Sequence, residues 1–306
     1  MTDCLSRLRL PVFQAPMFLQ SGPAMVIASC RAGIVGCFPS VNARSEDVLA
    51  QWLDEISAAV SPEDDAPWAI NLMMHRSNSR RNADLELAVH YRAPLVITAL
   101  GSPREAVDAV HSYGGLVFAD VIDPRFAAKA LEAGVDGLVL VAAGAGGHTG
   151  QIAGFAFVEE VRRFWDGPIV LGGGISTGRA VRAAEVLGAD YAYLGTRFIA
   201  SEESMADPDY KAMVVAASSS DIVCSDALTG VRANWLRQSL ARAGYDPDAM
   251  PSPGHIDVIA AAGDAKRWRD VWSAGQGVGA IDAVQPISAI VDDLARDYAA
   301  ARGTPA

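Results

Sequence analysis

The sequence predicts an α/β protein, a (β/α)8 TIM barrel with a helical cap inserted after its eighth strand. Short apolar runs, which are typical of buried parallel strands, alternate with helical segments through the first 200 residues. Eight such units are present, and eight strands close a parallel sheet into a barrel. The last two strands end in glycine and a small hydroxyl residue, at Gly172–Ser176 and Gly195-Thr196, as phosphate-binding strands 7 and 8 of such barrels do.

The predicted strands are almost wholly apolar, as expected of strands that are covered on both faces. The first strand ends at Pro16, because proline cannot continue a strand ladder. The eight strands cover residues 12–15, 34–38, 68–72, 95–98, 116–119, 137–141, 169–171 and 191–194.

A helix follows each of the first seven strands. Pro23 suits the first turn of the first helix, and Asp123-Pro124 marks the start of the fifth. The predicted helices cover residues 23–32, 45–60, 80–91, 103–112, 124–133, 154–165 and 177–187.

The pattern changes after Phe198. Residues 201–280 contain several helical stretches, among them Asn234–Arg237 and Lys266–Trp272, but no convincing strand. We interpret this region as a helical cap over the carboxyl-terminal mouth of the barrel. The expected domains are therefore a barrel of residues 1–200, completed by a last helix within 281–306, and a cap of residues 201–280.

Composition restricts the class of partner. Hydrophobic residues make up 51% and charged residues 20% of the 306 residues, which is ordinary for a soluble protein. A net charge of −11 without any basic run argues against nucleic acid or anionic membrane as a partner. No apolar segment is long enough to cross a bilayer, and the N-terminus lacks the layout of a signal peptide. We expect a cytoplasmic protein with free thiols and a small-molecule substrate, and a homodimer is compatible with the sequence.

The most informative titratable residue is His148. It follows the glycine-rich run Gly144–Gly147 at the end of the sixth strand, where the active site of a barrel lies. Histidine titrates near neutral pH and can transfer protons there, so we expect His148 to be catalytic or to contact the substrate. The other histidines are weaker candidates, and they are His75, His90, His111 and His255.

Other polar residues at strand ends are Gln14, Asn71 and Asp120. Each amide could bind a ligand or satisfy the backbone of a neighbouring loop. For Asp120 the alternatives are a second polar group of the site, helix capping, or an ion pair with an arginine. The strand ends offer no cluster of histidine and carboxylate side chains, so we expect no metal. The dinucleotide-binding G-x-G-x-x-G pattern is absent after the first strand.

Several motifs, taken together and in order, resemble those of the nitronate monooxygenase family. The motifs that carry the resemblance are Gln14–Met17, Asn71-Leu72, Ala145–Gly150, Gly172–Ile175, Gly195–Phe198, Glu202–Ser204 and Ala274–Gly279. They span nearly the whole chain. The resemblance implies an FMN-dependent barrel with a cap and a histidine, here His148, that serves as the base or proton donor beside the flavin.

The resemblance also implies the flavin-binding residues. The ring would lie along Ala15, Pro16 and Met17, with Asn71 in contact with it. The ribityl phosphate would be held by Gly173, Gly174, Gly195 and Thr196, and Gln276 would close over it. Gly146 and Gly147 are further cofactor-binding residues on this resemblance. One departure concerns the substrate: many relatives carry an acidic residue three or four positions before the histidine, where this chain has Ala143–Ala145.

Three functions remain open on the sequence. The first is an FMN-dependent oxidation of a nitronate, a nitroalkane or a similar stabilised carbanion with O₂. The second is an NAD(P)H-dependent reduction of an enoyl thioester or a quinone. Cap cations such as Arg232, Arg237 and Arg269 could bind a nucleotide or a phosphopantetheine, although we favour their interpretation as part of a solvated helix face. The third is a flavin-free barrel that acts on a sugar phosphate, although no lysine stands at a strand end to form a Schiff base.

Overall fold

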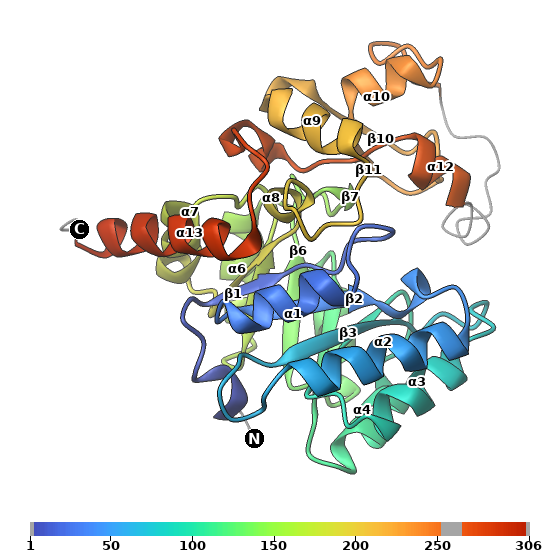
Figure 1. Cartoon of the computed structure of the whole chain (residues 1–306), viewed down its shortest axis with the longest axis vertical. Helices are drawn as coiled ribbons and strands as arrows, with labels where there is room; N and C mark the ends of the chain where they lie inside the picture. The colour runs from blue at the N-terminus through green and yellow to red at the C-terminus, as the bar shows by residue number, and fades with distance from the viewer. Residues whose placement is uncertain (1–2, 252–264, 304–306) are drawn as a thin grey trace.

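Eight parallel strands form a closed barrel in the computed structural model, which describes residues 3–251 and 265–303 (Figure 1). The first strand pairs in parallel with both the second and the last, and this pairing closes the barrel. The predicted fold class is confirmed. In order around the barrel the strands are β1 (Val12–Gln14), β2 (Val35–Pro39), β3 (Trp68–Met73), β4 (Leu95–Ala99), β5 (Leu116–Val121), β6 (Gly137–Val141), β8 (Ile169–Gly172) and β9 (Tyr191–Leu194).

Helices cover the outside of the barrel, and their ends follow local capping rules. The side chain of Ser45 accepts a hydrogen bond from the N–H of Val48, and Asp123 accepts two at the start of its helix. The barrel helices are α1 (Pro23–Arg31), α2 (Glu46–Ala59), α3 (Arg81–His90), α4 (Arg104–His111), α5 (Pro124–Glu132), α6 (Gly154–Arg162), α7 (Gly178–Leu187) and the short α8 (Thr196–Ile199). The last helix, α13 (Ile287–Arg302), packs against α7 as the predicted return to the barrel. Within the described residues, no helix has the length and apolar character that a membrane span needs.

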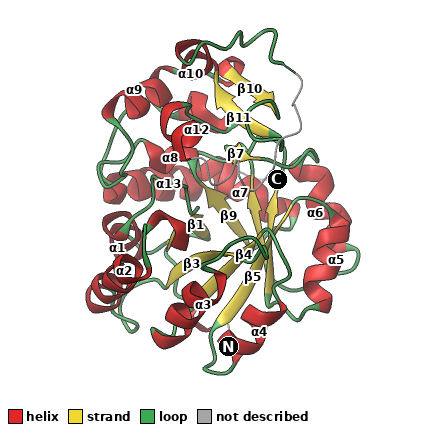
Figure 2. Cartoon of the chain, turned by 90° about the vertical axis from the view of Figure 1, so that its right-hand side faces the viewer, coloured by secondary structure: helices red, strands yellow, loops and turns green. Residues whose placement is uncertain are grey.

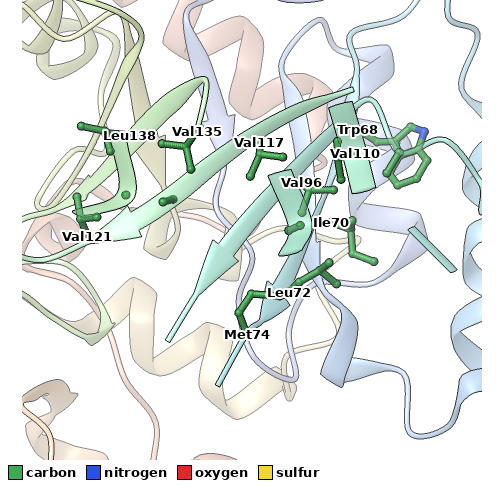
Figure 3. Packing of buried hydrophobic residues seen from close by; sticks show 14 of the residues in the cluster. Trp68, Ile70, Leu72, Met74, Val96, Val110, Val117, Val121, Val135 and Leu138 are labelled. Atoms are coloured by element: carbon green, nitrogen blue, oxygen red, sulfur yellow. The ribbon is translucent and has the colours of Figure 1, made fainter. Parts of the chain in front are cut away.

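Alternation along each strand produces two apolar layers. The inner layer fills the barrel, where the rings of Phe13 and Phe118 stack with their centroids 6.1 Å apart. The outer layer lies between strands and helices, and Figure 3 shows Ile70, Val96 and Val117 in it, on three neighbouring strands. The polar residues that come after these apolar residues in each strand therefore lie at the carboxyl-terminal ends of the strands, at the mouth of the barrel.

The cap differs from the prediction, because residues 201–280 do contain strands. The elements described here are α9 (Pro208–Ala216), β10 (Ile222–Ser225), β11 (Ala233–Leu236), α10 (Arg237–Arg242), α12 (Ala265–Asp270) and the 3-10 turn η4 (Gln276–Ala280). Strands β10 and β11 are antiparallel, and β7 (Gly147–His148) is the third strand of their sheet. This small sheet lies above the barrel (Figure 2).

The error has a physical reason. A run of four apolar residues is too short to distinguish a strand from a helical turn by its periodicity. Strand β11 is defined by its partners: all four of its residues pair with β10, and Ala233 and Asn234 also pair with His148 and Gly147 of β7. The division into a barrel and a cap at residues 201 and 280 stays a prediction, while the expectation that this region contains no strand is corrected.

Candidate active site

Two polar side chains meet inside the mouth of the barrel. Leu116 and Phe118 of β5 belong to the inner layer, so Asp120 points inward from the end of the same strand. The Nδ2 of Asn71, at the corresponding end of β3, donates to Asp120 Oδ2 at 3.2 Å. The partner of Asp120 is thus an amide, and no ion pair among the described residues includes Asp120. The prediction that Asp120 pairs with an arginine is therefore wrong for this part of the chain.

The carboxyl group of Asp120 is buried but accepts few hydrogen bonds. Its Oδ1 is buried and has no hydrogen-bond partner within the described residues. Burial raises the pKa of Asp120 to about 7, against the opposing effect of the hydrogen bond from Asn71. A carboxyl group with that pKa exchanges its proton near neutral pH.

Gln14 serves the local structure rather than a ligand. Its side chain is fully buried, and Oε1 accepts from the N–H of Cys37 at 3.0 Å. Its Nε2 donates to Ser21 Oγ at 3.2 Å and to the carbonyl of Ala15. The alternative of a structural role, left open by the sequence, is the one that the structure shows. The amide ties the turn after β1 to the neighbouring strand.

His148 lies on β7, between the barrel and the cap. Asn234 of β11 donates from Nδ2 to the carbonyl of Ala145 at 2.7 Å and so fixes the loop before the histidine. The imidazole meets the indole of Trp268 edge to face, with ring centroids 5.2 Å apart and the ring planes at 89°. Its Nε2 is buried and has no partner within the described residues, and burial lowers the pKa of His148. The imidazole is therefore neutral at neutral pH and can accept a proton.

The glycine-rich end of β8 leaves its backbone open. Gly173 and Gly174 both have positive φ, at 135° and 72°, a conformation that favours glycine. A Cβ added to Gly174 would meet nothing within 4 Å, so free space borders this stretch of backbone. At Gly195 the nearest atoms to an added Cβ would be Met17 Sδ at 3.6 Å, Ala15 Cβ at 3.7 Å and Met17 Cγ at 3.7 Å, all at ordinary contact distance. The segment after β1 and the end of β9 are thus neighbours.

Gly173, Gly174 and Gly195 form what we call the glycine clamp. Helix α7, which follows Gly174 in the chain, has few free N–H groups to add to anion binding there. The positive N-terminus of a helix can bind an anion where its first N–H groups are free. Two of its first N–H groups already have partners: that of Arg179 donates to Asp297 Oδ2 at 2.7 Å, and that of Ala180 to Thr177 Oγ1 at 3.1 Å. Anion binding here would therefore depend on the loop backbone and less on the helix.

One segment of the chain joins three of the predicted loops. The N–H of Gly275 donates to Thr196 Oγ1 at 2.8 Å, and the N–H of Gln276 donates to the carbonyl of Gly144 at 2.9 Å. A Cβ on Gly277 would come within 2.9 Å of the carbonyl oxygen of Gly174. Residues 275–277 therefore hold the ends of β6, β8 and β9 together, and the exposed side chain of Gln276 borders the mouth.

Most of the predicted site residues fall into three groups at this end of the barrel, while His148 belongs to none of them and lies on β7 against Trp268 of the cap. One group surrounds residues 275–277, a second joins the segment after β1 to β9, and a third is the pair of Asn71 and Asp120. Two other histidines lie elsewhere: His75 contacts Ser77, and His111 pairs with Asp136 at 2.8 Å. His90 is on helix α3, and His255 lies outside the described residues.

Three neighbours of the site were not found by sequence reasoning. Trp268 and Asn234 come from the cap, and their approach to the histidine loop depends on how the cap folds back. Tyr193 of β9 has a buried hydroxyl group without a partner within the described residues. It belongs to the inner layer, and only the alternation of β9 could have indicated this. Among the residues described, no three histidine, cysteine or acidic side chains form a group that could hold a metal ion.

Comparison with known proteins identifies the family of this chain. The sequence pattern of the family described as nitronate monooxygenase matches residues 2–297. The chain belongs to the nitronate monooxygenase family. The resemblance predicted from the motifs is confirmed, and the family consists of oxidoreductases.

Individual proteins are similar to this chain over most of its length. Protein Rv1533 of Mycobacterium tuberculosis is 33% identical over 230 residues, which cover 70% of this chain and 61% of that protein, so the matched part spans less than two thirds of that relative. The structure of FabK from Thermotoga maritima has a TM-score of 0.83 at 26% identity, covering 98% of this chain and 95% of FabK. A nitroalkane oxidase from Streptomyces ansochromogenes has a TM-score of 0.82 at 25% identity, covering 97% and 98%.

Proposed function

We propose that this protein is an FMN-dependent oxidoreductase that oxidises a nitronate, a nitroalkane or a similar stabilised carbanion with O₂. The observation that carries the proposal is the state of His148, a neutral imidazole whose buried Nε2 has no partner in the described part of the chain. It lies on the rim of a glycine-lined mouth in a chain of the nitronate monooxygenase family. The similar nitroalkane oxidase structure supports the same reaction class.

The residues present fit an FMN. The open backbone at Gly174 and the unobstructed Gly195 leave room for a phosphate to approach N–H groups without a Cβ in between. The buried, unpartnered atoms of His148 and Asp120 are polar groups that a ring with its own donors and acceptors would satisfy. Gly173, Gly174, Gly195 and neighbouring residues would hold the phosphate, with Asn71 and the Ala15–Met17 segment beside the ring. When bound, FMN supplies the electron-accepting group of the reaction.

His148 is the proton acceptor of this proposal. Because burial lowers its pKa, the imidazole is unprotonated at neutral pH and can take the proton from the carbon next to a nitro group. Asn234 holds the loop that carries it, through the carbonyl of Ala145. For a substrate that is already a nitronate, no proton needs to be removed, and His148 would orient the anion instead.

The reductase alternative has less support from the cap. Arg237 forms an ion pair with Asp248 at 2.8 Å, and Arg269 forms one with Asp270 at 2.8 Å. Both pairs lie on exposed surface, which favours the interpretation of these cations as part of a solvated helix face. A flavin-free reaction on a sugar phosphate has no support from the family match, which is to oxidoreductases.

Anaerobic stopped-flow spectroscopy tests the proposal. The purified protein, loaded with FMN, is mixed in turn with propyl nitronate, NADH and NADPH while the flavin absorbance is followed. We expect bleaching by the nitronate and none by the pyridine nucleotides. Bleaching by a pyridine nucleotide alone would establish the reductase alternative, and failure to bind FMN at all would favour the flavin-free one.

A further inference from the structure

Asp120 is an acidic residue at the mouth of the barrel that no step above uses. We propose that Asp120 is a second proton-carrying residue of the site, which as a neutral acid donates a hydrogen bond from Oδ1 to the bound flavin while Asn71 holds Oδ2. The inference rests on the proposed function, because it assigns a role toward the cofactor of that function.

The first argument is geometric. Asp120 is the last inward-facing residue of β5, directly above Phe118 of the inner layer. The hydrogen bond from Asn71 Nδ2 at 3.2 Å occupies Oδ2 and sets the orientation of the carboxyl group. Oδ1 is then left buried, and nothing in residues 3–251 or 265–303 gives it a hydrogen bond. A buried polar atom of this kind normally has a hydrogen-bond partner, so its orphaned state indicates a group that the described residues do not supply.

The second argument concerns charge. The groups that face Asp120 are the amide of Asn71 on β3, the hydroxyl of Tyr193 on β9 and the thiol of Cys37 on β2. None of the three is a cation. Burial raises the pKa values of both Tyr193 and Cys37 well above their ordinary values, and Asp120 adds to the rise in each. A carboxylate at this position would therefore lack compensation, whereas the neutral acid fits its surroundings.

The chemistry follows from these two points. A carboxylate can only accept hydrogen bonds, while a neutral carboxylic acid offers one O–H donor. With Oδ2 accepting from Asn71, the donor falls on Oδ1, the atom that lacks a partner. An O–H group on Oδ1 that donates to the flavin ring would stabilise the negative charge that the ring gains on reduction. A carboxylate at the same position would destabilise that charge. The proton of Asp120 should then affect how readily the flavin is reduced.

The test compares wild type with Asp120→Asn. The amide of this variant copies the neutral acid, since its oxygen can accept from Asn71 and its N–H₂ can donate, but it cannot ionise. The midpoint potential of the bound flavin is measured from about pH 5 to about pH 9, on either side of the pKa of Asp120. Asp136→Asn is the control, because Asp136 precedes β6 at the opposite end of the barrel. The phosphate of FMN titrates in all three proteins, so only differences between them count.

We expect wild type and Asp120→Asn to have the same midpoint potential at low pH. As the pH rises, the wild-type potential should fall below that of the variant, and the Asp136→Asn protein should follow wild type. Parallel curves for wild type and Asp120→Asn, with flavin bound to both, would overturn the inference and leave the proposed function standing. If neither wild type nor Asp136→Asn binds FMN, the proposed function fails and the inference fails with it.

A second measurement needs no flavin. The infrared spectrum of the flavin-free protein should contain a protonated carboxyl band that titrates near neutral pH and is lost in Asp120→Asn. The band should persist in Asp136→Asn. Absence of such a band from the difference between wild type and Asp120→Asn at low pH would show that Asp120 is ionised, which contradicts the inference.

Discussion

The ring of His148 meets the ring of Trp268 edge to face, 5.2 Å between centroids, and this contact joins the barrel's histidine loop to the cap. Trp268 itself rests on Trp235, a fully buried residue of β11, with centroids 4.6 Å apart. The indole thus shields one side of the imidazole from water. Because desolvation is what lowers the pKa of His148, the cap contributes to the protonation state of the barrel's candidate base.

The pH dependence of turnover should therefore respond to Trp268. His148 with a lowered pKa stays neutral to a lower pH than an exposed histidine, so the acid limb of kcat/KM should lie below the usual histidine range. In Trp268→Ala, water reaches the imidazole, its pKa rises, and the acid limb should move to higher pH. Trp268→Phe keeps an aromatic ring and should shift it less. Profiles of kcat/KM against pH with a neutral nitroalkane make the comparison, and an unchanged limb in Trp268→Ala would contradict it.

Removal of the imidazole should separate chemistry from cofactor binding. In His148→Asn the flavin should stay bound, because no phosphate contact is assigned to this side chain. Turnover of a neutral nitroalkane should fall by about 10² to 10⁴, which is the usual effect of losing a positioned acid or base. Turnover of a preformed nitronate should fall less, because that substrate has already lost its proton. Flavin content and steady-state rates of both substrates are the measurements, and equal losses for the two would refute the role as base.

The glycine clamp can be tested with two matched variants. Gly174 and Gly114 both have positive φ, at 72° and 86°, and an added Cβ would meet nothing within 4 Å at either position. An alanine therefore costs each about the same backbone strain, on the order of 1–3 kcal/mol. Only Gly174 lies in the candidate clamp, so Gly174→Ala should weaken FMN binding by about tenfold or more, or ~1.4 kcal/mol. Gly114→Ala should leave it unchanged. Fluorescence titration with FMN measures both, and equal affinities would show that the phosphate binds elsewhere.

The hydroxyl of Thr196 should matter for stability as well as for the cofactor. It accepts from the N–H of Gly275 at 2.8 Å, and both residues are buried. Thr196→Val would leave that donor without a partner at a cost of about 1–3 kcal/mol. Thr196→Ser keeps the acceptor and should stay close to wild type. Thermal unfolding of the flavin-free proteins checks the first effect. An FMN titration checks whether loss of this bond to residues 275–277 also weakens binding of the cofactor. A Thr196→Val protein as stable as wild type would contradict a stabilising role for the bond between Gly275 and Thr196.

The barrel could be predicted from sequence because its signals are local. Apolar runs, Pro23 at a helix start and Asp123 as a cap each act within a few residues, and the predicted barrel elements agree with the structure to within a few residues at their ends. The position of His148 after a glycine run at a strand end was equally local. Family motifs then supplied the flavin and a list of contact residues, which remains a proposal.

The cap could not be predicted in the same way. The stretch Asn234–Arg237 looked helical, but residues up to Leu236 form β11, because β10 pairs with this strand along its whole length and the histidine loop pairs with its first two residues. For Asp120 the sequence left several roles possible. Its contact with Asn71 forms because β3 and β5, which lie on either side of β4, both direct these side chains into the barrel.

The sequence by itself determined the eight βα units, the glycine-rich strand ends and the histidine after them, because hydrophobic period and backbone preference are encoded within short segments. Only the tertiary structure decided which groups surround that histidine and which carboxyl oxygen lacks a partner. Barrel closure and the folding back of the cap bring together residues such as Ala145 and Asn234, 89 positions apart. Burial, and with it the pKa values of His148 and Asp120, follows from that packing rather than from the sequence around either residue.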